Sequence, residues 1–475
     1  MTNKKCPVAK KCSGCQLSNM TYEQQLEWKQ KDTEKLLGSF GKVSEIIGAD
    51  DPYNYRNKVQ AVFRSDRNGR IISGVYQSSR NGIVGIDSCM LDDKRADEII
   101  VGIRGLLKSF KLQPYDEGTE RGFLRHVLVR VGKNTGEILV TLVGGNSMFP
   151  KKHDFVKALV KRFPDITTVT FSVNRTPEML LLGENNEVLY GEGYITDILC
   201  GKRFRISPHS FYQINHAQTE KLYDYAIKAA KLTKKDVLLD AYSGIGTIGI
   251  IASDYVKQVQ GIEYNASAVR DAVKNCHENG LTRNIAFNRG DAGEFLEKKA
   301  KLGTHYDAVI LDPARTGADR KFLNSLVKIA PERIVYISCN PATQARDLKT
   351  LTKKYSVTDI QPFDMFPHTR HVETVCLLSK LHEAKHHVNV RLDMDELDLT
   401  SAESKATYEE IKAYVAEHND GMKVSNLYIA QVKAKYGIIE RENYNKPKSD
   451  DARQPKCPKE KEVAIVEALK AFKMI

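Results

Sequence analysis

Residues 237–249 read VLLDAYSGIGTIG, an apolar run that ends at Asp240 and is followed by three glycines in the spacing GxGxxG. The apolar run predicts a buried strand, and the glycines predict a loop whose backbone approaches a ligand closely. The next apolar run ends in Glu263, and an acid at this place accepts hydrogen bonds from ribose hydroxyls. We therefore expect a nucleoside cofactor. The loop alone does not decide between a dinucleotide and S-adenosylmethionine, because both carry the ribose.

Further short apolar runs follow the glycine loop, separated by stretches with helical periodicity. They lie at 285–288, 308–311 and 334–338. Strands that alternate with helices predict a doubly wound α/β sheet, in which ligands bind at the carboxyl ends of the strands. Asp291 and Asp312 follow two of these strands and are expected at the same crevice. On spacing alone, either could instead be an ordinary helix cap.

A cysteine occupies the point where the last of these strands gives way to a helix. Cys339 lies within residues 336–347, which read YISCNPATQARD. A free thiol is only a few per cent thiolate near neutral pH, and the start of a helix raises that fraction through its free N–H groups and partial positive charge. Cys339 is therefore a candidate nucleophile. The alternative is a small core residue at a strand end, because cysteine is often buried.

The rest of the chain predicts two further regions. Between about residues 55 and 199, short strands and turn signals surround two helical segments, which is typical of an α+β region. The residues after 381 contain three helical patterns and a polar linker. We expect three parts: an α+β region over 1–200, a Rossmann-like α/β domain over 201–380 and a helical C-terminal extension over 381–475.

The chain is basic, with 72 Lys and Arg against 60 Asp and Glu and a net charge of +12. From Leu381 to the end there are 16 basic and 17 acidic residues, a net −1, so the preceding residues carry +13. Such a surface fits a polyanionic partner. No apolar run approaches the ~20 residues of a membrane span, and the N-terminus has no apolar signal core. We expect a cytoplasmic protein without a membrane partner.

Three of the nine cysteines lie close together near the N-terminus. Cys6, Cys12 and Cys15 have the spacing Cx5Cx2C, and Cys89 follows a strand-like segment. Four thiolates suit either a tetrahedral zinc ion or an iron–sulfur cluster. In a chain of this size, the grouping favours metal binding in a reducing compartment over disulfides.

Five motifs, taken in their order along the chain, resemble the RNA uracil-5 methyltransferase family. They are SFYQIN at 210–215, the loop at 240–249, DPAR at 312–315, SCNP at 338–341 and FPHTRHVE at 366–373. The resemblance covers about residues 6–380 and implies a class I, Rossmann-like S-adenosylmethionine methyltransferase domain. Through it, Gln213, Tyr242, Glu263 and Asp312 align with positions that contact the cofactor, and Asp291 is expected to line the same pocket.

The resemblance also implies how the methyl group is transferred. Carbon 5 of uracil is a poor nucleophile, and the family adds a cysteine thiolate to carbon 6, so that carbon 5 can attack the sulfonium methyl. Cys339 matches this cysteine. A base then removes the proton from carbon 5 so that the thiolate can leave, and Glu373 matches this base. Without the family context, Glu373 reads as a surface carboxylate beside two histidines and an arginine.

The implied substrate is RNA. The target base must come from a loop or be flipped out of its stack, and the basic surface of the first 380 residues would hold the surrounding phosphates. Tyr53, Tyr55 and Phe123 could stack on bases or belong to the core. No obligate protein partner is expected.

The resemblance assigns the cysteines to an iron–sulfur cluster. The ribosomal-RNA branch of the family carries a [4Fe-4S] cluster on four cysteines, at positions that match Cys6, Cys12, Cys15 and Cys89, whereas the transfer-RNA branch generally lacks it. We therefore expect formation of 5-methyluridine in 23S ribosomal RNA, with an iron–sulfur-bearing α+β domain ahead of the methyltransferase domain. Two alternatives stay open: a transfer-RNA uridine-5 methyltransferase, and an iron–sulfur oxidoreductase that uses a nicotinamide cofactor (NAD).

Overall fold

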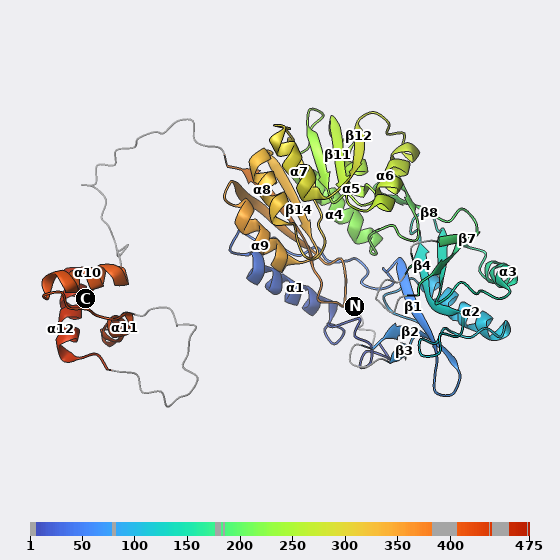
Figure 1. Ribbon diagram of the computed structural model, residues 1–475, viewed down its shortest axis with the longest axis horizontal. Helices are drawn as coiled ribbons and strands as arrows, with labels where there is room; N and C mark the ends of the chain where they lie inside the picture. Colours follow the sequence, from blue (N-terminus) through green and yellow to red (C-terminus); the bar gives the residue numbers. More distant parts are fainter. Residues whose placement is uncertain are drawn as a thin grey trace. The chain divides into compact units, whose positions relative to one another are not determined.

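Two seven-stranded sheets build most of the protein. The structure is a computed structural model that describes residues 6–77, 82–175, 182–183, 186–381, 406–436, 438, 456–472 and 474–475. The chain divides into two compact units, residues 1–383 and 384–475. Both sheets lie in the first unit (Figure 1).

The second sheet along the chain has the strand order β12-β11-β10-β13-β14-β16-β15. Its strands are β10 (Val237–Ala241), β11 (Gln258–Glu263), β12 (Ile285–Arg289), β13 (Ala308–Leu311), β14 (Arg333–Ser338), β15 (Tyr355–Phe363) and β16 (Glu373–Lys380). The strands from β12 to β14 pair in parallel, and β16 runs antiparallel to both of its neighbours. The order reverses between β10 and β13, as in a doubly wound sheet. The alternating pattern of the sequence is therefore confirmed as an α/β fold.

Helices cover both faces of this sheet (Figure 1). One face carries α4 (His216–Ala229), α5 (Thr247–Ala252) and α6 (Ala266–Glu278); the other carries α1 (Tyr22–Leu37), α7 (Ala292–Lys301), α8 (Arg320–Ile329) and α9 (Pro341–Leu351). Successive residues of a strand point to opposite faces. Leu238 accordingly packs in the core of the first helix layer and Leu239 in the core of the second, and both are fully buried. Burial on both faces explains the continuous apolar runs.

The first sheet has the order β3-β2-β1-β4-β5-β6-β7. Its elements are β1 (Lys58–Ser65), β2 (Ile71–Tyr76), β3 (Ile83–Gly85), β4 (Leu124–Val131), β5 (Ile138–Gly144), β6 (Ile166–Val173) and β7 (Asn186–Tyr190), with α2 (Lys94–Ser109) and α3 (Lys152–Arg162) packed on it. Only β5 and β6 pair in parallel, and α3 supplies the crossover that a parallel pair needs. The expected α+β region is confirmed. A hairpin of β8 (Ile195–Leu199) and β9 (Lys202–Ile206) then leads to α4.

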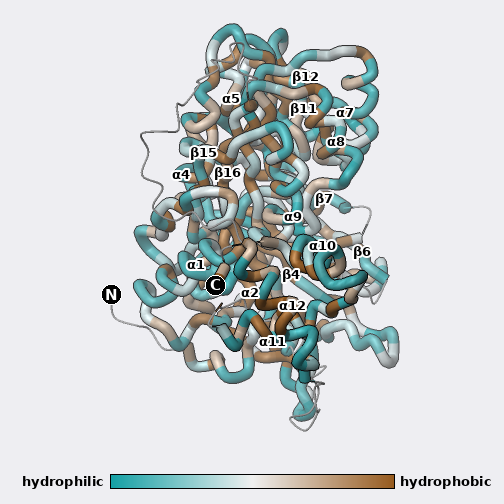
Figure 2. Tube along the Cα trace, turned by 90° about the vertical axis from the view of Figure 1, so that its left-hand side faces the viewer, coloured by the Kyte–Doolittle hydropathy of each residue, from teal (hydrophilic) through white to brown (hydrophobic). Residues whose placement is uncertain are grey.

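The second unit contains the helices α10 (Tyr408–His418), α11 (Asn426–Lys435) and α12 (Lys459–Ala471). Thr407 and Ser425 cap the first two by accepting a backbone N–H three residues on. Ile411, Ile429 and Ile465 share one small core, and hydrophobic stretches of α11 and α12 stand out in Figure 2. The three helices match the sequence patterns. Within the described ranges, every helix is too short or too polar to cross a bilayer.

Candidate active site

The reversal of strand order between β10 and β13 marks the crevice where ligands bind in sheets of this kind. The register pairs Ala241 at the end of β10 with Leu311 on one side, and with the residue before Glu263 on the other. Tyr242 and Asp312 therefore come one position beyond the paired residues of β10 and β13, and Glu263, the last residue of β11, lies at the same level. Three of the residues that the sequence assigns to a cofactor meet at one edge.

The loop after β10 is shaped to receive a ligand. Gly244 has a φ of +54° and Gly246 a φ of +82°, values that favour glycine. A Cβ at Gly246 would lie 2.6 Å from the ring of Phe287, whereas one at Gly244 would meet no atom of the described residues within 4 Å. Gly244 thus faces open space. The N–H groups of Gly244 and Asn265 donate to the two carboxylate oxygens of Glu263 at 3.0 and 2.7 Å, which orients the acid expected at the ribose.

The remaining cofactor candidates lie in different surroundings. The ring of Tyr242 packs against Phe322 of α8, with centroids 5.3 Å apart, so its phenol belongs to the helix layer. Asp291 is exposed and caps α7 by accepting from the N–H of Glu294 at 2.9 Å, as its helix-cap interpretation predicts. Gln213 is half-buried just before α4.

Two carboxyls at the crevice, those of Asp240 and Asp312, have raised pKa values. Desolvation raises the pKa of Asp312 to about 7. Burial likewise raises the pKa of Asp240 to about 7, although a hydrogen bond from the N–H of Gly249 at 2.9 Å acts in the opposite direction. Burial therefore favours the neutral form of both carboxyls. When ionised, they give the crevice a negative charge that suits a cationic ligand.

Cys339 directly follows β14, and Glu373 is the first residue of β16. These two strands are antiparallel neighbours. The register of β14 and β16 pairs Ser338 with Thr374, so Cys339 and Glu373 come opposite each other in the next positions. The hydroxyl of Thr374 donates to Gln344 Oε1 at 2.6 Å, which ties β16 to α9. Glu373 is only 3 % exposed, so its interpretation as a surface carboxylate is wrong.

The helix that follows Cys339 is capped by a side chain of the same motif. Asn340 Oδ1 accepts from the N–H of Ala342 at 3.2 Å, and Pro341 occupies the first turn. Asn340 Nδ2 donates to the carbonyl of Arg315 at 3.1 Å. The cap therefore also holds the loop after β13 next to the thiol.

A cavity of about 270 Å³ opens beside Cys339. Its lining comes from four segments and consists of Asp32, Arg315, Cys339, Asn340, Pro341, Arg370, His371 and Val372. Arg315 Nη2 lies 3.4 Å from His371 Nε2, and the guanidinium of Arg370 lies 5.9 Å from the ring centroid of Trp28. Guanidinium groups bind the phosphates and carbonyl oxygens of nucleotides. The cavity thus places a thiol among groups suited to a nucleotide.

The surroundings of Cys339 keep its thiol protonated. Burial, followed by Glu373 and Asp312, raises the pKa of Cys339 to about 11, although Arg315 acts in the opposite direction. Burial and then Asp312 raise the pKa of Glu373 well above its usual value. The expectation that the helix start raises the thiolate fraction is therefore wrong for the resting protein, because desolvation and carboxyl groups outweigh the helix terminus.

Alkylation of Cys339 is expected to accelerate with pH across the whole neutral range. Only the thiolate reacts, and with a pKa of about 11 its fraction rises about tenfold per pH unit between roughly pH 7 and pH 10. Timed iodoacetamide treatment followed by mass spectrometry of the Cys339 peptide measures the rate. An unstructured thiol peptide in the same reaction should level off near its ordinary pKa. Levelling of the Cys339 rate near pH 8 would contradict the raised pKa.

The fold brings Cys89 to the cysteines that precede α1. Arg56 and Asp92 shift the pKa of both Cys15 and Cys89, so both thiols lie beside the same pair of charges. Burial raises the pKa of Cys15 to about 11 and that of Cys89 to about 12. The remaining two candidates, Cys6 and Cys12, also raise the pKa of Cys15, so they lie near it. All four are free thiols.

These thiols neighbour one another without converging on a single point. Among the described residues, no three histidine, cysteine, aspartate or glutamate side chains meet in a geometry that holds one metal ion. A zinc ion needs its four ligands around one atom, whereas a four-iron cluster takes one thiolate per iron and spreads its ligands more widely.

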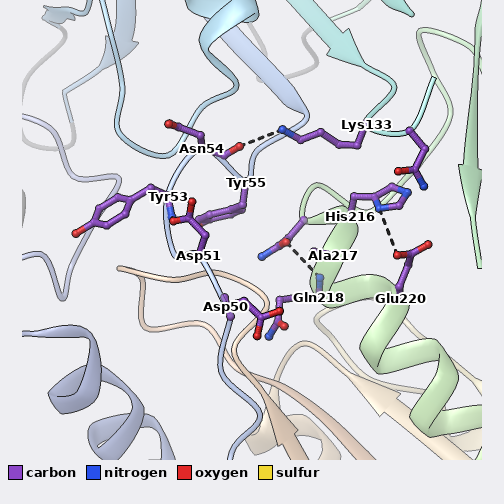
Figure 3. A pocket seen from close by; sticks show the side chains of 13 residues that line it. Asp50, Asp51, Tyr53, Asn54, Tyr55, Lys133, His216, Ala217, Gln218 and Glu220 are labelled. Carbon is purple, nitrogen blue, oxygen red and sulfur yellow. Dashed lines mark hydrogen bonds and ion pairs between the residues drawn. The ribbon is translucent and has the colours of Figure 1, made fainter. Parts of the chain in front are cut away.

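A second cavity, of about 390 Å³, lies between the loop at 49–55, the turn at 133–134 and the start of α4 (Figure 3). The carboxyls that line it are Asp50, Asp51 and Glu220. Lys133 Nζ donates to Asp93 at 2.7 Å and to the carbonyl of Asn54 at 3.1 Å, so its charge is already compensated. The sequence carries no signal for this cavity, because three distant segments form it.

The fold also shows where the three aromatic residues proposed to stack on bases lie. Tyr55 and Phe123 are 5 and 2 % exposed, so the interpretation of these two as stacking platforms is wrong and the core interpretation is confirmed. The ring of Tyr53 lies 5.0 Å from that of His368. Sequence reasoning gave no role to Arg315 or His371, although both stand inside the quoted motifs. Both residues belong to motifs that the sequence analysis quoted, but only the folded chain shows that they line the cavity beside Cys339.

The chain is similar in sequence to a family of RNA-modifying enzymes. Residues 183–381 match a family model described as tRNA (Uracil-5-)-methyltransferase. An uncharacterized RNA methyltransferase of Halalkalibacterium halodurans is 39% identical over 379 residues, which cover 78% of this chain and 82% of that protein. One from Staphylococcus aureus (strain MSSA476) is 38% identical over 379 residues and covers 79% and 83% of the two chains.

A solved structure is similar over most of the first unit. It is the tRNA (uracil-54, C5)-methyltransferase of Pyrococcus abyssi in complex with S-adenosyl-L-homocysteine. The two proteins superpose with a TM-score of 0.64 and 28% sequence identity, over 79% of this chain and 87% of that one.

Proposed function

Because this chain belongs to the RNA (uracil-5-)-methyltransferase family, we propose that it forms 5-methyluridine in 23S ribosomal RNA. The observation that carries the proposal is the register that sets Cys339 opposite Glu373, next to the strand end that carries Asp312. The family relationship makes the enzyme an S-adenosylmethionine-dependent methyltransferase. It overturns the alternative of a nicotinamide-dependent oxidoreductase.

In the proposed reaction, Cys339 is the nucleophile and Glu373 the base. The thiol loses its proton, and Sγ bonds to carbon 6 of the target uracil while the electron pair of the 5,6 double bond shifts toward the carbonyl at carbon 4. Carbon 5 then takes the methyl group of S-adenosylmethionine, whose sulfur keeps the electron pair of the broken S–CH₃ bond and leaves as a neutral thioether. Glu373 removes the proton from carbon 5, the double bond forms again and Sγ leaves. The raised pKa of Glu373 makes its ionised form a stronger proton acceptor than an exposed carboxylate.

Gln213, Tyr242, Glu263, Asp291 and Asp312 are the residues that we propose to hold S-adenosylmethionine, which supplies an electrophilic methyl group. The open space at Gly244 and the oriented carboxylate of Glu263 fit a nucleoside. The carboxyl of Asp312, which follows β13 at the crevice, offers a negative charge to a sulfonium cation when it is ionised. The Pyrococcus abyssi enzyme with S-adenosyl-L-homocysteine supports the same assignment.

The choice of 23S ribosomal RNA follows from the four cysteines that match the ribosomal-RNA branch. Transfer RNA is the second candidate, because it appears in the description of the family model and in the name of the Pyrococcus abyssi enzyme. Mapping 5-methyluridine in total RNA from cells with and without the gene tests both. Loss from 23S ribosomal RNA alone supports the proposal, loss from transfer RNA alone selects the second candidate, and no loss contradicts both.

We further propose that Cys6, Cys12, Cys15 and Cys89 hold a [4Fe-4S] cluster. Methyl transfer moves no net electrons, so a structural role is favoured. The N–H of Leu17 donates to the carbonyl of His368 at 3.0 Å, which joins the cysteine segment to the motif that contains Glu373. The proposal assigns residues 1–200 to the cluster and RNA contact, residues 201–380 to methyl transfer and no chemistry to 381–475. It places the protein in the cytoplasm, where thiols stay reduced.

Replacing Cys89 with serine is expected to lower the iron and acid-labile sulfide bound per chain, because a cluster on four thiolates loses one ligand. Elemental analysis and sulfide assay of anaerobically purified protein measure the change. Cys200→Ser, which changes a half-buried thiol elsewhere in the first unit, should leave both contents unaltered. Stoichiometric zinc in place of iron would contradict the cluster.

A further inference from the structure

The loop between β15 and β16, residues 364–372, leads directly into Glu373. It also carries Arg370 and His371, which line the cavity beside Cys339. The geometry of this loop therefore decides where these two nucleotide-facing side chains lie and how the chain enters β16 at the proposed base, which the pairing with β14 and β15 also holds. The first part of the loop contacts α1, more than 300 positions earlier in the sequence.

A buried ion pair joins α1 to the start of this loop. Lys29 Nζ donates to Asp364 Oδ1 at 2.5 Å and to the carbonyl of Phe366 at 3.1 Å. The hydroxyl of Tyr22 donates to the other oxygen of Asp364 at 2.9 Å. Both charged side chains are 0 % exposed. Because two charges lose their hydration on burial, such a pair is weak evidence for stability, and its presence calls for another explanation.

A strained residue lies in the same loop and is held by the same helix. His368 has a φ of +68°, in the left-handed region that a residue with a side chain adopts only when its surroundings enforce it. Gln25 stands one turn before Lys29, on the same face of α1. Its Oε1 accepts from the N–H of His368 at 2.8 Å, and its Nε2 lies 3.2 Å from His368 Nδ1. The helix thus enforces an unfavourable backbone conformation two residues before Arg370.

We propose that Lys29 and Asp364 are positioning residues for the catalytic loop: the ion pair sets the loop so that Glu373 and His371 face the base bonded to Cys339. This inference rests on the proposed function. The nucleophile and the cofactor crevice have separate supports, since β14 and the Asn340 cap place Cys339, while β10, β11 and β13 build the crevice. Loss of the ion pair should therefore impair the steps that need the loop.

Other contacts keep the loop attached when the ion pair is removed. Asn215 Nδ2 donates to the carbonyl of Met365 at 3.0 Å, and the hydroxyl of Tyr55 donates to that of Pro367 at 3.1 Å. Gln218 Nε2 donates to the carbonyl of Asp364 at 3.0 Å. The expected defect is a misplaced loop in a folded protein.

Lys29→Met is the first variant to test, with the full chain and the RNA that the wild type methylates. We expect kcat to fall about 10- to 100-fold, because a misplacement of about 1 Å has this effect on catalysis. The covalent enzyme–RNA adduct should accumulate, since removal of the proton by Glu373 becomes slow. Affinity for S-adenosylhomocysteine and the alkylation rate of Cys339 should stay within about twofold of wild type. Glu27→Gln, an exposed change on the same helix, should behave as wild type.

The double variant Lys29→Met/Asp364→Asn separates positioning from stability. It leaves no unpaired buried charge, and the amide can still accept from Tyr22, so its melting temperature should recover relative to Lys29→Met. The bond to the carbonyl of Phe366 remains absent, so kcat should remain low. Recovery of kcat together with melting temperature would overturn the inference, as would wild-type kcat in a folded Lys29→Met protein. A wild-type enzyme that methylates neither RNA would instead refute the proposed function.

Discussion

Replacing Cys339 with alanine is expected to abolish methyl transfer to RNA, with a loss of roughly 10⁴-fold or more, because a nucleophile that forms a covalent intermediate has no substitute. Without the bond from Sγ to carbon 6, carbon 5 of uracil stays unreactive toward the methyl donor. The half-buried thiol lies beside the cavity and opposite Glu373, so its removal leaves the cofactor crevice untouched. Incorporation of labelled methyl groups into RNA measures the effect.

Two controls isolate the chemistry of Cys339 from its packing. Cys339→Ser keeps the shape of the side chain but offers a much weaker nucleophile, so it should be nearly as inactive. Cys200→Ala, at another half-buried thiol, should retain full activity. Both Cys339 variants should bind S-adenosylhomocysteine as tightly as wild type. Undiminished methyl incorporation by Cys339→Ala would end the proposed mechanism.

Replacing Glu373 with glutamine is expected to trap the enzyme on its substrate. Addition of Cys339 and methyl transfer need no base at carbon 5, but release does, so the covalent adduct should accumulate while turnover falls by about 10²- to 10⁴-fold. Burial and Asp312 raise the pKa of Glu373 well above its usual value, which favours the neutral form of the side chain. Glutamine matches this neutral form in shape and charge, so the fold should be preserved.

A denaturing gel with labelled RNA shows the adduct as a slow-migrating species. The species should require both the methyl donor and Cys339, and should therefore be missing from Cys339→Ala/Glu373→Gln. Its mass should equal that of the enzyme plus the methylated RNA fragment. Normal turnover, or no adduct despite intact RNA binding, would remove Glu373 from the role of base.

The regular elements of this protein could be predicted from local patterns. Strands buried on both faces leave continuous apolar runs such as 237–240. Capped amphipathic helices such as Lys94–Ser109 leave apolar residues at helical spacing. The glycine loop could also be predicted from the sequence, because its backbone requires glycine. Gly246 has a positive φ, and the ring of Phe287 leaves no room for a Cβ there. These signals are local, so they survive in the sequence.

The charge state of the candidate site could not be predicted in this way. The helix start predicted a more acidic thiol at Cys339, but the folded chain surrounds it with Glu373 and Asp312, and these raise its pKa. The partnership of Lys29 with Asp364 had no local signal, since the two residues are 335 positions apart. Desolvation and charge interactions depend on distances in space, which a linear pattern does not contain.

The sequence by itself determined the order of strands and helices, the loop for a nucleoside and the residue types that uracil-5 methylation requires, because each depends on neighbours within a few positions. Only the tertiary structure decided that Cys339 meets Glu373 across β14 and β16, that Cys15 and Cys89 share Arg56 and Asp92, and that α1 holds the catalytic loop. The physical reason is that strand register and burial arise from packing between distant segments, and these set which groups interact and how strongly.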